Sequence, residues 1–151
     1  MNGSENRETI ERFWQLFEAR DWEQAWGLLH TDFTAFWPHT GEVFSGPDNF
    51  IAVNQNFPPI GDWHIHVRRI IADGDVVASE IEVTHDYGLS YAASFFEMMD
   101  GKISRVTEYW VEAGSEEPPE WRAGWVDHLE RPATYYGATG QRARRTPNKP
   151  G

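Results

Sequence analysis

The strongest candidate for chemistry is a glutamate in a strand-like stretch of the sequence. Residues 102–112 read KISRVTEYWVE and follow an Asp-Gly dipeptide that is typical of tight turns. Because alternate residues of a strand share a face, Glu108 lies on the same face as Val106 and Trp110. If this face is buried, desolvation raises the pKa of the carboxyl, and the acid can accept or donate a proton near neutral pH. If the face is exposed, Glu108 is an ordinary solvated or ion-paired side chain.

Two further glutamates share a face of a second strand-like segment. In the run VVASEIEV, Glu80 and Glu82 are two residues apart and project to the same side. If that side is concave and faces Glu108, up to three carboxylates meet. Like charges that close cannot all ionise, so one of the three acids holds a proton that it can donate while another accepts one. The alternative is that Glu82 lies near the solvated mouth.

Histidines and aromatic rings supply further candidates. His64 and His66 share a strand face, a spacing that suits metal ligands, a general base or hydrogen-bonding partners of a substrate. The chain contains no cysteine, which excludes thiol catalysis and thiolate metal sites. Aromatic residues make up 15% of the sequence, more than a core needs. The rings expected to line a pocket are Trp37, Trp63, Tyr91, Phe95 and Trp110, with ordinary core packing as the alternative for each ring.

The charge distribution limits the class of partner. The net charge is −11, from 24 acidic and 13 basic side chains, which argues against nucleic acid or an anionic membrane as the main partner. Four basic residues stand in the last eleven positions, where there is no acid, and we expect residues 131–151 to form a flexible basic tail. The sequence has no run of about 18 apolar residues and no signal-peptide core. The expected location is therefore the cytoplasm.

Hydrophobic periodicity predicts an α+β fold. Residues 7–20 carry apolar side chains at helical spacing, and Asp21 is placed to cap a second short helix. A strand pair follows over residues 33–45, and Pro47 stands near the start of a third helix. Residues 63–113 alternate apolar and polar side chains between turn signals, which predicts four strands in an antiparallel meander. This order predicts helices packed on one face of a curved sheet.

The order of elements resembles the nuclear transport factor 2-like superfamily, and more closely its SnoaL-like branch. The resemblance covers residues 7–113 and rests on the N-terminal helical hairpin and on the runs FWPHTGEVFSGPDNF, VVASEIEV and FFEMMDGKISRVTEYW. It implies a cone-shaped curved antiparallel sheet with helices packed on its concave face, the cystatin-like α+β barrel, around a deep apolar cavity. We therefore expect a cone domain over residues 1–113 and a C-terminal helical extension over residues 114–130 that packs on it.

The resemblance also implies roles for individual residues. The superfamily includes polyketide cyclases, ketosteroid isomerase, limonene epoxide hydrolase and scytalone dehydratase, so the fold alone does not choose a reaction. In the cyclases and the epoxide hydrolase, the acid before Tyr-Trp on the last strand is catalytic, and Glu108 holds that position here. Glu80 and Glu82 stand where the epoxide hydrolase carries an arginine and an aspartate. The arginine is therefore absent from this sequence, which counts against the same epoxide hydrolase mechanism. His39 lies near the position at which the cavity of the family opens.

The resulting expectation is a cofactor-free and metal-free acid/base enzyme that acts on a small hydrophobic molecule as a cyclase, isomerase or hydrolase. Glu108 is its expected acid/base, with Glu80 as partner. The alternative is a non-catalytic ligand-binding or assembly module of the same fold. Because the family often forms homodimers through the open sheet face, the resemblance implies Arg105, Thr107 and Tyr109 as interface residues.

Overall fold

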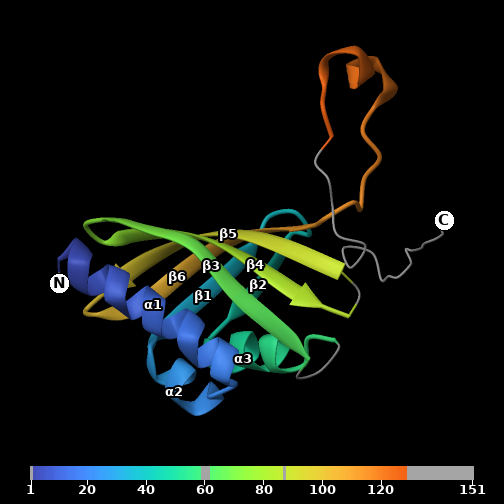
Figure 1. The fold of residues 1–151 in the computed structure, drawn as a ribbon. Helices are drawn as coiled ribbons and strands as arrows, with labels where there is room; N and C mark the ends of the chain where they lie inside the picture. The colour runs from blue at the N-terminus through green and yellow to red at the C-terminus, as the bar shows by residue number, and fades with distance from the viewer. Residues whose placement is uncertain (1, 59–61, 87, 129–151) are drawn as a thin grey trace.

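The computed structural model describes residues 2–58, 62–86 and 88–128 and shows an α+β fold in which helices cover one face of a curved sheet (Figure 1). The elements in chain order are α1 (Gly3–Ala19), α2 (Trp22–Gly27), β1 (Leu29–Trp37), β2 (Glu42–Ser45), α3 (Pro47–Gln55), β3 (Trp63–Asp73), β4 (Val76–His85), β5 (Gly88–Met99), β6 (Lys102–Glu112) and the short 3-10 helix η1 (Glu120–Trp125).

The six strands form one mixed sheet. Their spatial order is β2-β1-β6-β5-β4-β3, and the predicted meander of four strands occupies the β3 to β6 side. The expectation of a wholly antiparallel sheet is wrong at one position, because β1 runs parallel to β6, with Ala35 beside Val106. The chain between these two strands is long enough to cross over to the far edge of the sheet and return, which parallel pairing requires.

The turns that join the strands follow from local sequence. Asp100 and Gly101 have φ angles of 54° and 75°, and positive values at both positions are typical of the two-residue turn that matches the twist of a hairpin. Gly74, with φ of 61°, lies in the turn between β3 and β4. The carbonyl of Gly74 accepts a hydrogen bond from the buried Asn6 side chain at 2.9 Å, which ties α1 to this turn.

Helix α1 supplies much of the core. Asn2 caps it and forms a capping box with Glu5, and the predicted apolar stripe is buried, with Ile10 and Phe13 fully inaccessible. The helix packs across β3 and β4, and the Phe13 ring meets Phe96 of β5 edge-on at 5.5 Å. Truncating Phe13 to alanine would cost about 3–5 kcal/mol of stability.

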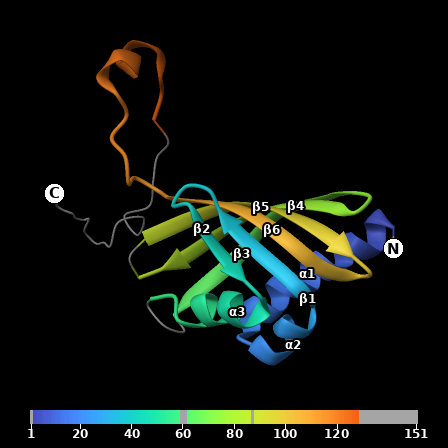
Figure 2. The ribbon, with the colours of Figure 1, turned by 180° about the vertical axis from the view of Figure 1, so that it is seen from behind.

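Helices α2 and α3 close the other end of the same face. Asp21 caps α2 as predicted, since its side chain accepts a hydrogen bond from the Gln24 amide at 3.1 Å. Phe50 of α3 is buried against Phe33 of β1 at 5.1 Å between ring centroids. Seen from behind, the three helices leave the opposite face of the sheet uncovered (Figure 2).

The segment after β6 differs from its prediction. Residues 114–128 are exposed along their length and project away from the sheet, and their one helical element is η1 (Figure 1). Trp121 and Trp125 are 72% and 81% exposed, so the expected helical extension does not pack on the domain within the described residues. Pro118 and Pro119 disfavour helical structure in the residues before them, so η1 begins only after Pro119. This 3-10 helix is too short to present an apolar face. Residues 129–130 and the predicted basic tail lie outside the described residues.

Candidate active site

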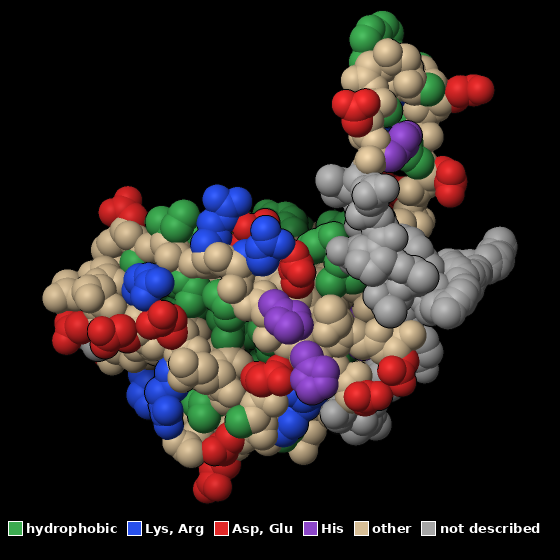
Figure 3. All heavy atoms as spheres, viewed as in Figure 1, with side chains coloured by type: hydrophobic (Ala, Val, Ile, Leu, Met, Phe, Trp, Pro, Cys, Tyr) green, Lys and Arg blue, Asp and Glu red, His purple; other side chains and the backbone are tan. Residues whose placement is uncertain are grey.

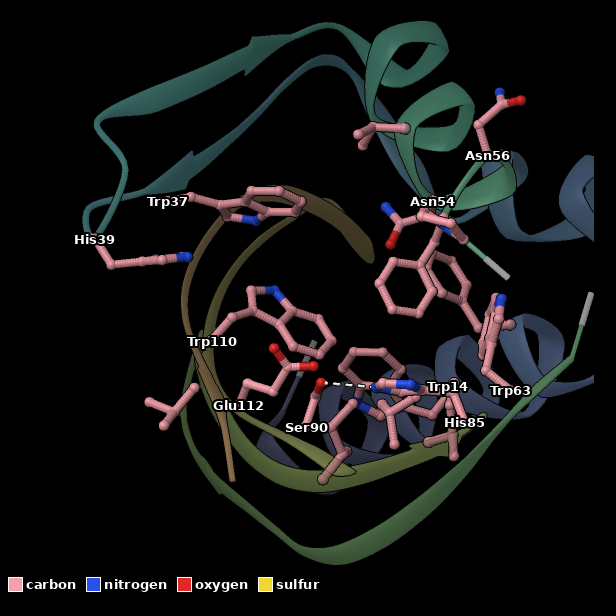
Figure 4. A pocket seen from close by; sticks show the side chains of 18 residues that line it. Trp14, Trp37, His39, Asn54, Asn56, Trp63, His85, Ser90, Trp110 and Glu112 are labelled. Carbon is pink, nitrogen blue, oxygen red and sulfur yellow. Dashed lines mark hydrogen bonds between the residues drawn. The ribbon is translucent and has the colours of Figure 1, made fainter. Parts of the chain in front are cut away.

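A cavity of about 610 Å³ opens between the helices and the inner face of the sheet (Figure 4). Its walls come from α1, the end of β1 and the residues after it, the C-terminal end of α3 and the residues after it, and the strands β3 to β6. Six large aromatic side chains line it: Trp14, Phe17, Trp37, Phe57, Trp63 and Trp110. A cavity of this size and composition suits a small molecule that is largely apolar.

Glu108 faces inward, as predicted if its strand face is buried. Its exposure is 2%, and its neighbour on the same face, Val106, is fully buried. The Trp37 indole N–H donates a hydrogen bond to one carboxyl oxygen at 3.0 Å, and the Ser94 hydroxyl donates to the other at 2.8 Å. Ser94 is directly opposite Glu108 in the register of β5 and β6, so the pair is set by strand pairing.

Burial raises the pKa of Glu108, because the charged carboxylate loses its hydration. Hydrogen bonds from Ser94 and Trp37, together with the nearby Trp110 N–H, act in the opposite direction, since they favour the charged form, but desolvation is the larger effect. Trp110 comes close to the carboxyl without completing hydrogen-bond geometry, and its buried Nε1 has no partner among the described residues. The carboxyl is therefore held in a site that favours its protonated form.

Glu108 lies one layer behind the cavity surface. Trp37 and Trp110 both line the cavity, and their indole planes meet at 66° with 6.5 Å between centroids. Glu108 itself is not among the lining residues. The acid is thus coupled to the cavity through two tryptophans.

Glu80 and Glu82 do not face the cavity, and the expectation of three converging carboxylates is wrong. They alternate with Ile81 and Val83, which line the cavity, and so project to the uncovered face of the sheet. Glu80 pairs with Arg69 at 2.7 Å, and Glu82 pairs with Arg68. Exposed ion pairs of this kind contribute about 0–1 kcal/mol to stability.

His64 and His66 also lie outside the cavity, where alternation on β3 directs Trp63 and Ile65 inward instead. The His64 Nδ1 is 2.9 Å from a carboxylate oxygen of Glu18 on α1, at the edge of the sheet. His66 is exposed. Figure 3 shows histidine and acidic side chains close together on this side of the molecule.

Three of the five aromatic rings that were expected to line the pocket do so. Trp37, Trp63 and Trp110 line the cavity, and so does His39. The His39 and Trp37 rings are stacked, with 6.3 Å between their centroids. Tyr91 and Phe95 belong to the opposite face of β5, so their predicted contact with the cavity is wrong.

Phe95 is 45% exposed and meets the Tyr109 ring at 6.3 Å. Both rings lie on the uncovered face.

The structure adds polar lining residues that sequence reasoning did not select. They are Asn54, Asn56, His85, Ser90 and Glu112. His85 follows Ile81 and Val83 at intervals of two, so its parity with these apolar residues was a usable signal. The signal for Asn54 and Asn56 is weaker, because they stand where α3 ends and the sequence gives no direction for their side chains.

Within residues 2–58, 62–86 and 88–128, no cluster of three or more His, Asp or Glu side chains is arranged to hold a metal ion. In the same part of the chain, no helix is long and apolar enough to cross a membrane.

Comparisons with known proteins agree with this architecture. A provisionally named ketosteroid isomerase from Kribbella flavida DSM 17836 is similar in structure, with 30% identity and a TM-score of 0.77, over 89% of this chain and 97% of that one. An NTF-2-like protein of unknown function from Burkholderia xenovorans LB400 has 26% identity and a TM-score of 0.69, over 84% and 97% of the two chains.

A more distant structure shares the fold. An LEH-like epoxide hydrolase from M. tuberculosis has 18% identity and a TM-score of 0.60, over 72% of this chain and 84% of that one. No curated protein matches the sequence. The SnoaL-like domain family matches residues 10–106, which include both β1 with Trp37 and the start of β6. The chain therefore belongs to the SnoaL-like domain family, within the nuclear transport factor 2-like fold.

Proposed function

We propose that this protein is a cofactor-independent acid/base enzyme, of the cyclase, isomerase or hydrolase type, that acts on a small hydrophobic molecule in the aromatic cavity. The observation that carries the proposal is the Glu108 carboxyl, which is 2% exposed and has a raised pKa directly behind two cavity-lining tryptophans. Strongly perturbed carboxyls beside cavities are typical of catalytic acids and bases.

The surroundings of Glu108 suit proton transfer in both directions. In its protonated form the carboxyl donates a proton to a carbonyl or epoxide oxygen of the substrate. The carboxylate that results is stabilised by the Trp37 N–H and the Ser94 O–H, which already point at its two oxygens and need no reorganisation.

Contact between Glu108 and a substrate requires one of the two indoles to move. Trp37 is anchored by its hydrogen bond to the carboxyl, whereas the Trp110 Nε1 has no partner among the described residues. We infer that Trp110 is the side chain that moves aside when a substrate occupies the cavity, which exposes the carboxyl to it.

A specific observation favours a second function, that of a non-catalytic ligand-binding module. Glu108 does not line the cavity, and both of its oxygens already accept hydrogen bonds from protein groups. In that case Glu108 holds Trp37 in place and takes no part in chemistry.

The test compares wild type with Glu108→Gln, which keeps the size and polarity of the side chain but cannot transfer a proton. Cyclic ketones would be screened for deuterium uptake at the α carbon by NMR, and epoxides for ring opening. We expect Glu108→Gln to lower turnover by about 10²- to 10⁴-fold while ligand binding persists. Glu80→Gln is the matched control on the uncovered face. Unchanged turnover in Glu108→Gln would contradict the catalytic role, and ligand binding by a wild type that catalyses neither reaction would favour the binding module.

We also propose that the protein forms a homodimer through the uncovered face of the sheet. Phe95 and Tyr109 lie on this face, and each is 45% exposed. Adjacent exposed rings on an uncovered sheet face are typical of a surface that another protein covers. The ion pair partners Arg105 and Glu97, 3.8 Å apart, flank the same area.

A further inference from the structure

The wall of the cavity carries a polar pair that is separate from Glu108, which lies behind the wall. His85 ends β4 and Ser90 stands near the start of β5, and the hairpin between these strands brings the His85 Nε2 to 3.1 Å from the Ser90 Oγ. Both residues line the cavity, and Figure 4 shows the hydrogen bond between them at its wall. Glu112 lines the cavity beside them, because it is opposite Ser90 in the register of β5 and β6.

The two polar centres are separated along the strand direction. Ser90 and Ser94 are on the same face of β5, four residues apart, which corresponds to about 13 Å along a strand. Ser94 holds Glu108 at one position, and Ser90 holds His85 at the other. Trp110, which lines the cavity, is opposite Ala92, the residue between the two serines on this face of β5.

The hydrogen-bonding capacity of the pair suits an oxygen atom that carries no charge. Burial lowers the pKa of His85, although the charges of Glu112 and Asp86 oppose this shift, so the imidazole favours its neutral form. If the His85 Nε2 accepts from the Ser90 hydroxyl, the serine oxygen can accept from a ligand O–H. If the Nε2 donates instead, the Ser90 hydroxyl can donate to a ligand carbonyl.

The charges at the cavity disfavour an anionic ligand. No lysine or arginine lines the cavity in the part of the chain that the structure describes, whereas the Glu112 carboxylate does. A carboxylate or phosphate at the His85 end would meet a like charge without a compensating cation.

We propose that His85 and Ser90 form the polar end of a ligand site, and that the ligand is an uncharged ring compound whose hydroxyl or carbonyl oxygen hydrogen-bonds to this pair. The inference rests on the proposed function in placing the ligand in the same cavity, and it names the ligand class. The apolar rings of the ligand lie along the aromatic wall, and Glu112 excludes acids at the mouth.

The test uses three probes of similar size, namely naphthalene, 2-naphthol and 2-naphthoate. Their dissociation constants would be measured at neutral pH by two-dimensional NMR titration of the full chain. We expect 2-naphthol to bind about 3- to 10-fold more tightly than naphthalene, as one added hydrogen bond implies, and 2-naphthoate to bind most weakly. The His85 ring protons should shift on addition of 2-naphthol.

Two variants and one control assign the preference to the pair. Ser90→Ala and His85→Phe should each reduce the ratio of naphthalene to 2-naphthol dissociation constants to near one. His66→Gln, on the uncovered face, should leave the ratio unchanged. Equal binding of naphthol and naphthalene to wild type, tightest binding of naphthoate, or a preference that survives in both variants would overturn the inference.

Absence of binding by all three probes would also overturn it. None of these measurements requires turnover. A protein without catalytic activity can still show the preference, so failure of the enzyme proposal is distinguishable from failure of this one.

Discussion

The Trp37 indole N–H donates a hydrogen bond to the Glu108 carboxylate oxygen at 3.0 Å, across 71 positions of sequence. The bond joins the end of β1 to β6, which pair in parallel, and its acceptor is buried at the inner face of the sheet. A cavity-lining ring is thereby fixed to an acid whose pKa burial raises.

The first prediction concerns stability and pH. Burial raises the pKa of Glu108 in the folded state, so between the unfolded value of about 4.3 and the folded value the folded protein binds more protons than the unfolded chain. The stability that Glu108 contributes is fully present below the unfolded pKa and is lost as pH rises through the folded pKa.

Glu108→Gln does not titrate at this position. The free energy of unfolding of the variant should therefore increase relative to that of wild type as pH rises from about 4. The increase is up to about 1.4 kcal/mol per pH unit and stops once the folded pKa of Glu108 is passed. Urea unfolding of both proteins between pH 4 and pH 9 measures the difference. A difference that stays constant over this range would show that the carboxyl is not buried in its neutral form.

The second prediction concerns the donors around the acid. Because the Trp37 N–H stabilises the carboxylate, Trp37→Phe should raise the pKa of Glu108 further, and Ser94→Ala should do the same. The measurement is a carboxyl-carbon NMR titration, with Glu108→Gln to assign the signal. Trp63→Phe is the matched control, since Trp63 lines the cavity but does not bond to Glu108. A lower pKa in Trp37→Phe would contradict the assigned role of the indole.

The third prediction concerns the two glutamates on the uncovered face. Glu80→Gln and Glu82→Gln each remove one surface ion pair and should change the free energy of unfolding by no more than about 1 kcal/mol. Neither variant should alter ligand affinity or turnover. Thermal unfolding, the naphthol titration and the ketone and epoxide assays check these statements, and a large loss of turnover in Glu80→Gln would mean that this acid reaches the cavity after all.

The fourth prediction concerns the proposed homodimer. Tyr109→Asp places a charge among exposed apolar side chains of the uncovered face and should shift the protein toward monomer in sedimentation equilibrium. Trp125→Ser, which changes an 81% exposed ring in η1, is the control and should leave the association constant unchanged. A wild type that sediments as a monomer at high concentration would remove the proposal.

Several local features of this protein follow from its amino-acid sequence alone. The apolar stripe of α1, the Asp21 cap and the Asp100-Gly101 turn all depend on interactions within a few residues, so they could be predicted without tertiary information. Strand alternation likewise placed Glu108 on one face with Val106, and that face is buried.

Which face of each strand turns toward the cavity depends on tertiary packing. A period of two specifies that Glu80 lies opposite Ile81, but it does not say which of them faces the helices, and a shift of one residue exchanges the two faces. Packing of α1 against β3 and β4 turns Ile81 inward and leaves Glu80 with Arg69. His85 and Ser90 are only five positions apart, and the register of the β4–β5 hairpin brings their side chains into hydrogen-bond distance. That the pair faces a cavity depends on the packing of helices from elsewhere in the chain against the same face of the sheet, which no short window of sequence contains.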